Sequence, residues 1–87
     1  MTVVFSITEY DYMADALARL GAFERGAIER DVFPDGEHYL RVASEVLDQH
    51  AVIIGGTISD TATLVLYDLA CAVVENGAST LTLIVPW

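Results

Sequence analysis

The chain of 87 residues has a formal net charge of −9 and is 54% hydrophobic, with a mean hydropathy of +0.47. Its thirteen acidic residues stand against four arginines and no lysine, so its surface repels phosphate backbones and anionic lipids, which excludes nucleic acids and membrane surfaces as expected partners. A short chain with so apolar a composition buries little of its own surface. The composition therefore predicts that this chain is a segment of a longer protein and that its apolar faces are covered by other parts.

The sequence indicates neither a secretory leader nor a membrane span. The N-terminal stretch MTVVFSITEYDYMAD lacks a basic region and acquires acidic residues early, unlike a signal peptide. No apolar run approaches the roughly 20 residues that cross a bilayer. We therefore expect a cytoplasmic location.

The N-terminal residues predict a strand followed by a helix. The apolar run TVVF, residues 2–5, is typical of a short buried strand. Thr8 is a good helix cap, and Asp11 three residues later completes an acidic version of the capping box. Apolar residues then recur at helical spacing until Gly21, where the helix is expected to end.

A β-hairpin is predicted around residues 28–42. Apolar and polar residues alternate in AIERDVF and again in HYLRV, and the sequence PDG lies between these two runs. Pro34 suits the second position of a type I turn, Asp35 the third and Gly36 the fourth. Between residues 43 and 48 we expect a loop or a short helical turn.

The second half of the chain predicts a strand, a helix and a second strand. AVII, residues 51–54, is a continuous apolar run of the kind buried in a parallel sheet. Ser59 and Asp60 are helix caps, residues 61–75 form a long apolar helix, and Asn76-Gly77 is a left-handed stop. The apolar run TLTLIVP then completes a βαβ unit with a parallel pair of strands. The fold class is therefore α/β with a parallel sheet.

Most candidate sites for chemistry have a structural interpretation. His38 and His50 are twelve residues apart with no cysteine partner, so we assign no metal ligand to either. Cys71 lies in an apolar helical pattern and is expected to be a small buried core residue. The sequence Gly55-Gly56-Thr57 matches no phosphate-binding fingerprint and favours a tight strand-to-helix connection. We assign no catalytic residue to this chain.

The stretch FPDGE, residues 33–37, has two interpretations. Turn chemistry alone accounts for Pro34 and Gly36. Phe33, however, is a poor choice for an exposed hairpin tip, and two carboxylates follow it. An aromatic ring beside two acceptors suits an adenine, because the ring stacks on the base and a carboxylate accepts a hydrogen bond from the exocyclic amine. The residues alone leave both interpretations open.

The segment FPDGEHYLRV resembles the F-x-D-G-E-x-x-V-R/Q-V segment of the ribose-phosphate diphosphokinases, or phosphoribosyl pyrophosphate synthetases. The helix motif ALARLGA comes before it, and AVIIGGT, a helix that ends in ENGA, and TLTLIVPW follow in the family's order. TLTLIVPW is similar to the family's VTLVIPYF. The resemblance covers almost the whole chain, and FPDGE and the terminal strand are its most specific parts.

The resemblance implies that residues 1–87 are the N-terminal part of a phosphoribosyltransferase-like domain, with the rest of that domain and a second domain outside this chain. It implies transfer of the diphosphoryl group of ATP to ribose 5-phosphate, with Mg²⁺, to make phosphoribosyl pyrophosphate for nucleotide biosynthesis. It implies a homo-oligomer in which Phe33, Asp35 and Glu37 contact an adenine in the active site of a neighbouring subunit. The metal ligands and the catalytic residues are expected beyond Trp87, so the segment alone is not expected to be active.

The chain also departs from the family pattern. SITEYDY replaces the usual turn with Gly and Asn after the first strand, and the loop before the second helix is about two residues short. Leu47 stands where many members carry a basic residue for a regulatory phosphate, so we do not expect the common phosphate and ADP regulation. These departures leave open an alternative, in which the protein is a non-catalytic, synthetase-like regulatory or oligomerisation protein.

Overall fold

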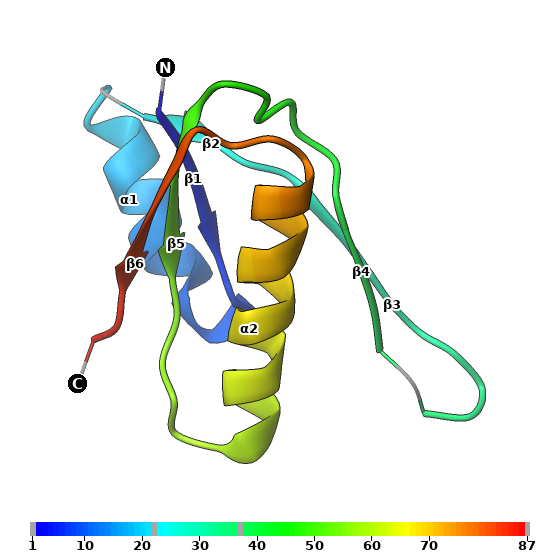
Figure 1. Cartoon of the computed structure of the whole chain (residues 1–87). Helices are drawn as coiled ribbons and strands as arrows, with labels where there is room; N and C mark the ends of the chain where they lie inside the picture. Colours follow the sequence, from blue (N-terminus) through cyan, green and yellow to red (C-terminus); the bar gives the residue numbers. More distant parts are fainter. Residues whose placement is uncertain (1, 22, 37, 87) are drawn as a thin grey trace.

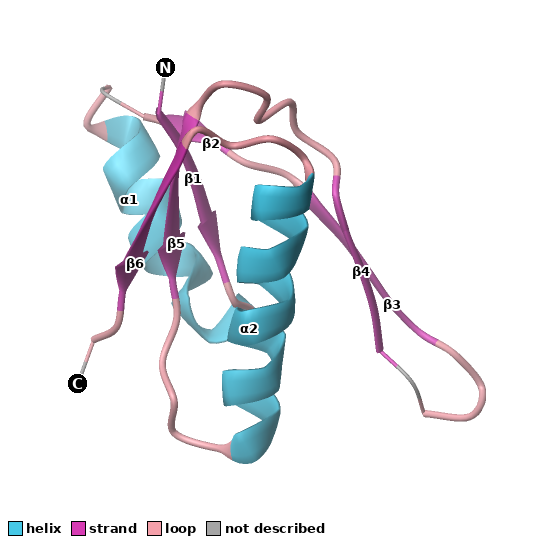
Figure 2. Cartoon of the chain, viewed as in Figure 1, coloured by secondary structure: helices cyan, strands magenta, loops and turns pink. Residues whose placement is uncertain are grey.

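The computed structural model describes residues 2–21, 23–36 and 38–86, which form a parallel sheet with one helix on each face and a separate antiparallel hairpin (Figures 1 and 2). In chain order the elements are β1 (Thr2–Ser6), the 3₁₀ turn η1 (Thr8–Tyr10), α1 (Asp11–Arg19), β2 (Glu24–Arg25), β3 (Ile28–Val32), β4 (His38–Val42), β5 (His50–Ile54), α2 (Asp60–Glu75) and β6 (Thr80–Ile84). The predicted α/β class is confirmed.

The sheet has the strand order β2-β1-β5-β6, and every pair in it is parallel. Val3 lies opposite Ala51, and Ile53 lies opposite Leu83. The predicted βαβ unit is confirmed, since β5, α2 and β6 follow one another with β5 and β6 paired in parallel. The two-residue strand β2 was not predicted, because so short a strand carries no periodicity of its own.

Two apolar clusters lie on opposite faces of the sheet, as alternation along each strand requires. One cluster packs under α2 and the other under α1, so the architecture has three layers (Figure 1). None of the helices in the described residues has the length and apolar character needed to cross a bilayer. The sheet residues in the α2 cluster are Val3, Phe5, Ala51 and Ile53, and those in the α1 cluster are Val4, Val52 and Ile54.

The two helix starts differ in how well the sequence predicts them. Ser59 caps α2, and its Oγ accepts a 3.0 Å hydrogen bond from the backbone amide of Ala62, as predicted. The predicted cap at Thr8 is wrong, because Thr8 lies inside the 3₁₀ turn and α1 has no side-chain cap. The Asp11 carboxylate instead faces β1, where it accepts a 2.6 Å hydrogen bond from the fully buried hydroxyl of Ser6.

The hairpin of β3 and β4 confirms the prediction for residues 28–42. Ile28 pairs with Val42 at its base, and Val42 is buried in the cluster under α2. In Figure 1 the two strands run obliquely away from the sheet, and their turn lies toward the same end of the molecule as the arrowheads of the parallel strands. The hairpin is therefore anchored at its base and projects at its turn.

Two single-residue expectations need correction. His50 was expected in the loop before a strand, but it is the first residue of β5, and its ring nitrogens contact the hydroxyls of Thr80 and Thr82 on β6. Cys71 was expected to be buried, but it is half-buried on α2. Cys71 lies near Leu81 of β6, an edge strand of the described sheet, where side chains stay partly open.

Candidate functional site

The first candidate site is the hairpin tip, by which we mean residues 33–36. The backbone amide of Gly36 donates a 2.8 Å hydrogen bond to the carbonyl oxygen of Phe33, and Gly36 has a φ of 88°. This closes the predicted four-residue turn with Pro34 and Asp35 at its centre. The Phe33 side chain is 46% exposed and Asp35 is exposed. Two of the three predicted adenine contacts thus share one turn, whereas Glu37 lies outside the described residues.

A pair of charged side chains lies across the two strands behind the tip. Glu29 on β3 lies opposite Arg41 on β4, and the Arg41 guanidinium donates hydrogen bonds of 2.7 and 2.9 Å to the two carboxylate oxygens. The hydrogen bond from Arg41, together with its positive charge, lowers the pKa of Glu29 below the ordinary value of 4.5. A two-pronged pair of this kind fixes the orientation of the two side chains relative to each other.

The chemistry available at the hairpin tip is recognition rather than catalysis. An exposed ring can stack on a planar base, and the Asp35 carboxylate can accept hydrogen bonds from an amino group. A hairpin tip is convex, whereas sites for small molecules are concave and bury most of the ligand. A base that stacks on Phe33 therefore needs its opposite wall from a surface beyond the tip.

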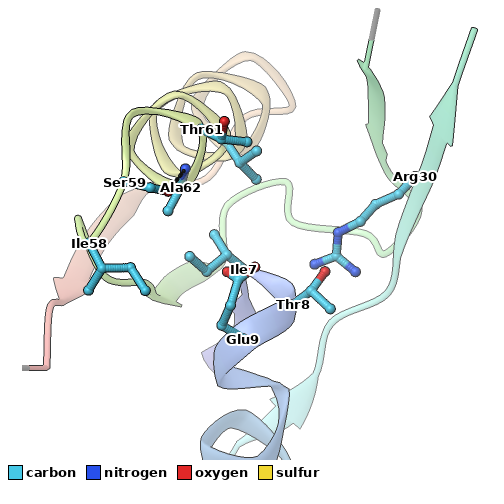
Figure 3. A pocket seen from close by; sticks show the side chains of 9 residues that line it. Ile7, Thr8, Glu9, Arg30, Ile58, Ser59, Thr61 and Ala62 are labelled. Atoms are coloured by element: carbon cyan, nitrogen blue, oxygen red, sulfur yellow. Dashed lines mark hydrogen bonds between the residues drawn. The ribbon is translucent and has the colours of Figure 1, made fainter. Parts of the chain in front are cut away.

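A second candidate site is a pocket of about 250 Å³ that the sequence did not predict (Figure 3). It lies where the chain leaves β1, where α2 begins, and beside β3 of the hairpin. We call it the switch-point pocket, because the strand order reverses at β1. The chain continues from β1 to its neighbour β2 on one side of β1, and β5 and β6 lie on the other side. Its lining residues are Ile7, Thr8, Glu9, Arg30, Ile58, Ser59, Thr61, Ala62 and Val65.

Arg30 is the residue that joins the hairpin to this pocket. Figure 3 shows its side chain extending from β3 toward Thr8 and Ile7. One guanidinium nitrogen, Nη2, donates a 2.7 Å hydrogen bond to the backbone carbonyl of Ser6. Across the pocket, Ser59 is occupied as the cap of α2. The pocket thus combines one cation, the carboxylate of Glu9, hydroxyl groups and an apolar wall. No sequence pattern predicted this pocket, because its lining residues come from three segments that are distant in the chain.

The connection Gly55-Gly56 beside this pocket has a packing explanation. A Cβ on Gly55 would lie 2.8 Å from Cδ1 of Leu66, and a Cβ on Gly56 would overlap the phenol of Tyr10. The amide of Gly55 also donates a 3.0 Å hydrogen bond to the carbonyl of Ile84. A side chain at either glycine would require Leu66 or Tyr10 to shift, which favours the predicted tight connection.

The sequence matches a known family over nearly its whole length. Residues 2–87 match the profile of the family described as the N-terminal domain of ribose phosphate pyrophosphokinase. A ribose-phosphate pyrophosphokinase of Saccharolobus solfataricus is 31% identical over 75 residues, which covers 84% of this chain and 26% of that protein. The chain thus spans about a quarter of the length of this curated relative.

Solved phosphoribosyltransferases share the fold. A hypoxanthine-guanine phosphoribosyl transferase of L. donovani has a TM-score of 0.63 at 15% identity, with 97% of this chain and 51% of that chain covered. A hypoxanthine phosphoribosyltransferase of Staphylococcus aureus has a TM-score of 0.60 at 14% identity, with 97% and 49% covered. The predicted phosphoribosyltransferase-like fold is confirmed, and the chain spans about half of each of these structures.

Proposed function

The chain belongs to the family of the N-terminal domain of ribose phosphate pyrophosphokinase, and from this premise we propose that it is the N-terminal segment of a cytoplasmic ribose-phosphate diphosphokinase. The full-length enzyme transfers the diphosphoryl group of ATP to ribose 5-phosphate and so makes phosphoribosyl pyrophosphate for nucleotide biosynthesis. In this proposal residues 1–87 contribute binding surface, and the groups that act on the phosphates belong to other parts of the enzyme.

The contribution of this segment is an adenine contact. Phe33 stacks on the base, and Asp35 accepts a hydrogen bond from its amino group, with Glu37 as a second acceptor. The observation that carries this role is the hairpin tip itself, which exposes 46% of an aromatic side chain next to a carboxylate in one closed turn. Stacking on an aromatic ring tolerates only a flat partner, and the carboxylate selects a base with an N–H donor.

The shape of the tip supports a site shared between subunits. Because the tip is convex and projects from the sheet, its ring fits as one wall of a pocket on another subunit (Figure 1). Oligomerisation is then a requirement for binding ATP, and we propose a homo-oligomer. The formal charge of −9 also argues that the triphosphate is held elsewhere, by cationic groups and Mg²⁺ outside this segment.

The test is a diphosphoryl-transfer assay on the full-length protein with ATP, Mg²⁺ and ribose 5-phosphate, in which release of AMP is followed. We expect activity, and we expect Asp35→Asn to raise the KM for ATP while the KM for ribose 5-phosphate stays unchanged. A full-length protein that binds ATP without transferring its diphosphoryl group would favour the regulatory alternative. A change in the KM for ribose 5-phosphate alone would contradict the adenine role.

A further inference from the structure

Arg30 links the hairpin to the parallel sheet. It lies on β3, three residues before Phe33, and its Nη2 donates a 2.7 Å hydrogen bond to the backbone carbonyl of Ser6. Figure 3 shows its side chain extending from the hairpin toward the turn that follows β1. The two partners are 24 residues apart in the chain and belong to separate parts of the fold. The hydrogen bond therefore constrains where the hairpin lies relative to the sheet.

The acceptor end of this hydrogen bond is fixed in the fold. Ser6 is the last residue of β1, is fully buried, and lies opposite Ile54 in the parallel ladder. Its hydroxyl donates a 2.6 Å hydrogen bond to the carboxylate of Asp11 at the start of α1. The backbone at Ser6 is thus held by the sheet and by a side-chain contact, so it is a rigid reference point for the hairpin.

The donor end lies beside a cavity. Nearer the base, apolar contacts hold the hairpin, because Val42 is buried in the cluster under α2 and Leu40 packs against that cluster. Arg30 lies opposite Leu40, and its side chain lines the switch-point pocket of about 250 Å³. The Glu9 carboxylate lines the same pocket and favours a positive charge there. A cavity gives a strand no van der Waals support, so the angle of the hairpin depends on the hydrogen bond across it.

The tip lies beyond this contact and is sensitive to the angle of β3. Phe33 follows Arg30 by three residues, roughly 10 Å along an extended strand at about 3.3 Å per residue. Over that length, a tilt of about 15° moves the ring by roughly 2–3 Å. Stacking requires van der Waals contact, and a gap of about 1 Å already forfeits up to half of the dispersion energy. A stacking role for Phe33 therefore requires a hairpin that is held at one angle.

We propose that Arg30 is a positioning residue for the adenine contact. Its hydrogen bond to the Ser6 carbonyl holds the hairpin at the angle that presents Phe33 to the neighbouring subunit. Arg30 touches no base in this scheme and acts through Phe33. The inference rests on the proposed diphosphokinase function and adds to it that the fold of one subunit sets the orientation of a ring that binds in the site of another.

The test is the kinetics of the full-length enzyme with varied ATP. Arg30→Gln should raise the KM for ATP by about 2- to 13-fold, the factor for one lost hydrogen bond, because a smaller fraction of hairpins then presents Phe33 correctly. The kcat and the KM for ribose 5-phosphate should stay unchanged. Arg30→Lys should recover most of the wild-type KM, since an ammonium donates the same single hydrogen bond to a carbonyl. Arg19→Gln, which removes the same charge from an exposed residue of α1, should behave as the wild type.

A double variant separates positioning from other roles. Because Arg30 acts through Phe33, Arg30→Gln should raise the KM for ATP no further in the Phe33→Ala background. Independent effects of the two substitutions would overturn the proposal, and so would an equal effect of Arg19→Gln. Faster hydrogen exchange of residues 28–42 in Arg30→Gln would also overturn it, since the residue would then support the folding of the hairpin and not its orientation.

The same kinetics distinguish failure of this inference from failure of the proposed function. A KM for ATP that Phe33→Ala leaves unchanged would reject the adenine role, and the positioning role with it. A KM that rises in Phe33→Ala but not in Arg30→Gln would reject the positioning role alone. A change confined to the KM for ribose 5-phosphate in Arg30→Gln would likewise reject positioning, because it would show that Arg30 acts at another substrate.

Discussion

The backbone amide of Gly36 donates a 2.8 Å hydrogen bond to the carbonyl oxygen of Phe33, and this contact closes the tip of the hairpin. The turn is therefore set by backbone atoms and by the positive φ of Gly36. Neither depends on the ring of Phe33, which is 46% exposed. Substitutions of the Phe33 and Asp35 side chains leave the two backbone atoms of this contact in place.

Phe33→Ala in the full-length protein should raise the KM for ATP. Base stacking on an aromatic ring is worth about 1–3 kcal/mol, which corresponds to a rise of about 5- to 150-fold. Steady-state kinetics with varied ATP measure this change. Tyr12→Ala is the matched control, because it removes an aromatic side chain that is 67% exposed on α1. An ATP response that is unchanged in Phe33→Ala, or equally impaired in both variants, would rule out the stacking role.

The pair of Glu29 and Arg41 should make the hairpin sensitive to acid. Because the hydrogen bond and the charge of Arg41 lower the pKa of Glu29 in the folded state, the pair stabilises the hairpin above the ordinary carboxyl pKa of 4.5. That contribution is lost as the pH falls through the lowered value. Carboxyl chemical shifts of Glu29, followed by NMR from pH 6 to about pH 2, give the pKa directly. In Arg41→Gln the Glu29 pKa should move up toward 4.5, and identical titration curves would contradict the assignment.

Local patterns in the sequence predicted most of the fold. The alternation of apolar and polar residues over residues 28–42 predicted the hairpin, and the triplet Pro34, Asp35 and Gly36 predicted its turn. Ser59 predicted the start of α2, and Asn76-Gly77 predicted its end, where Gly77 has a φ of 92°. Each of these features depends on residues close together in the chain, so its physical cause is visible in the sequence.

Features built from distant residues were missed. The capping signal at Thr8 failed because Asp11 is engaged by Ser6 and Arg25 instead, through contacts 5 and 14 residues apart. In the switch-point pocket, Arg30 of the hairpin lies beside the end of β1 and the β5–α2 loop. No local pattern in the sequence predicts that these three segments lie together. The chemistry of Phe33 and the two carboxylates left a binding role open, and the family resemblance, not periodicity, favoured that role.

Gly26→Ala should destabilise the fold by about 1–3 kcal/mol, because the added methyl group overpacks the core. Its Cβ would overlap three carbon atoms of the Phe5 ring, which is fully buried under α2. Urea unfolding measures the loss. Phe5→Leu makes room, so the double variant should be less destabilised than the sum of the two single variants. Additive losses, or an unchanged midpoint in Gly26→Ala, would show that the contact does not limit packing.

The isolated 87-residue chain should self-associate through β6. This is one of the two edge strands of the described sheet, and residues 78–86 carry no charged side chain. Leu83 and Val85 are each 47% exposed, and an open apolar edge without charges is a template for strand pairing. Sedimentation velocity should therefore show species larger than a monomer despite the net charge of −9.

Leu83→Lys should shift that distribution toward the monomer, since two lysines would meet where two edges pair. Tyr12→Lys is the control, because it makes the same change in net charge on an exposed side chain of α1. Lowering the net charge from −9 to −8 slightly reduces the repulsion between chains, so the control should associate at least as well as the wild type. Only a substitution that blocks pairing at the β6 edge should reduce association in spite of the weaker repulsion. A wild-type chain that sediments as a single monomer, or two lysine variants that behave alike, would show that β6 does not drive association.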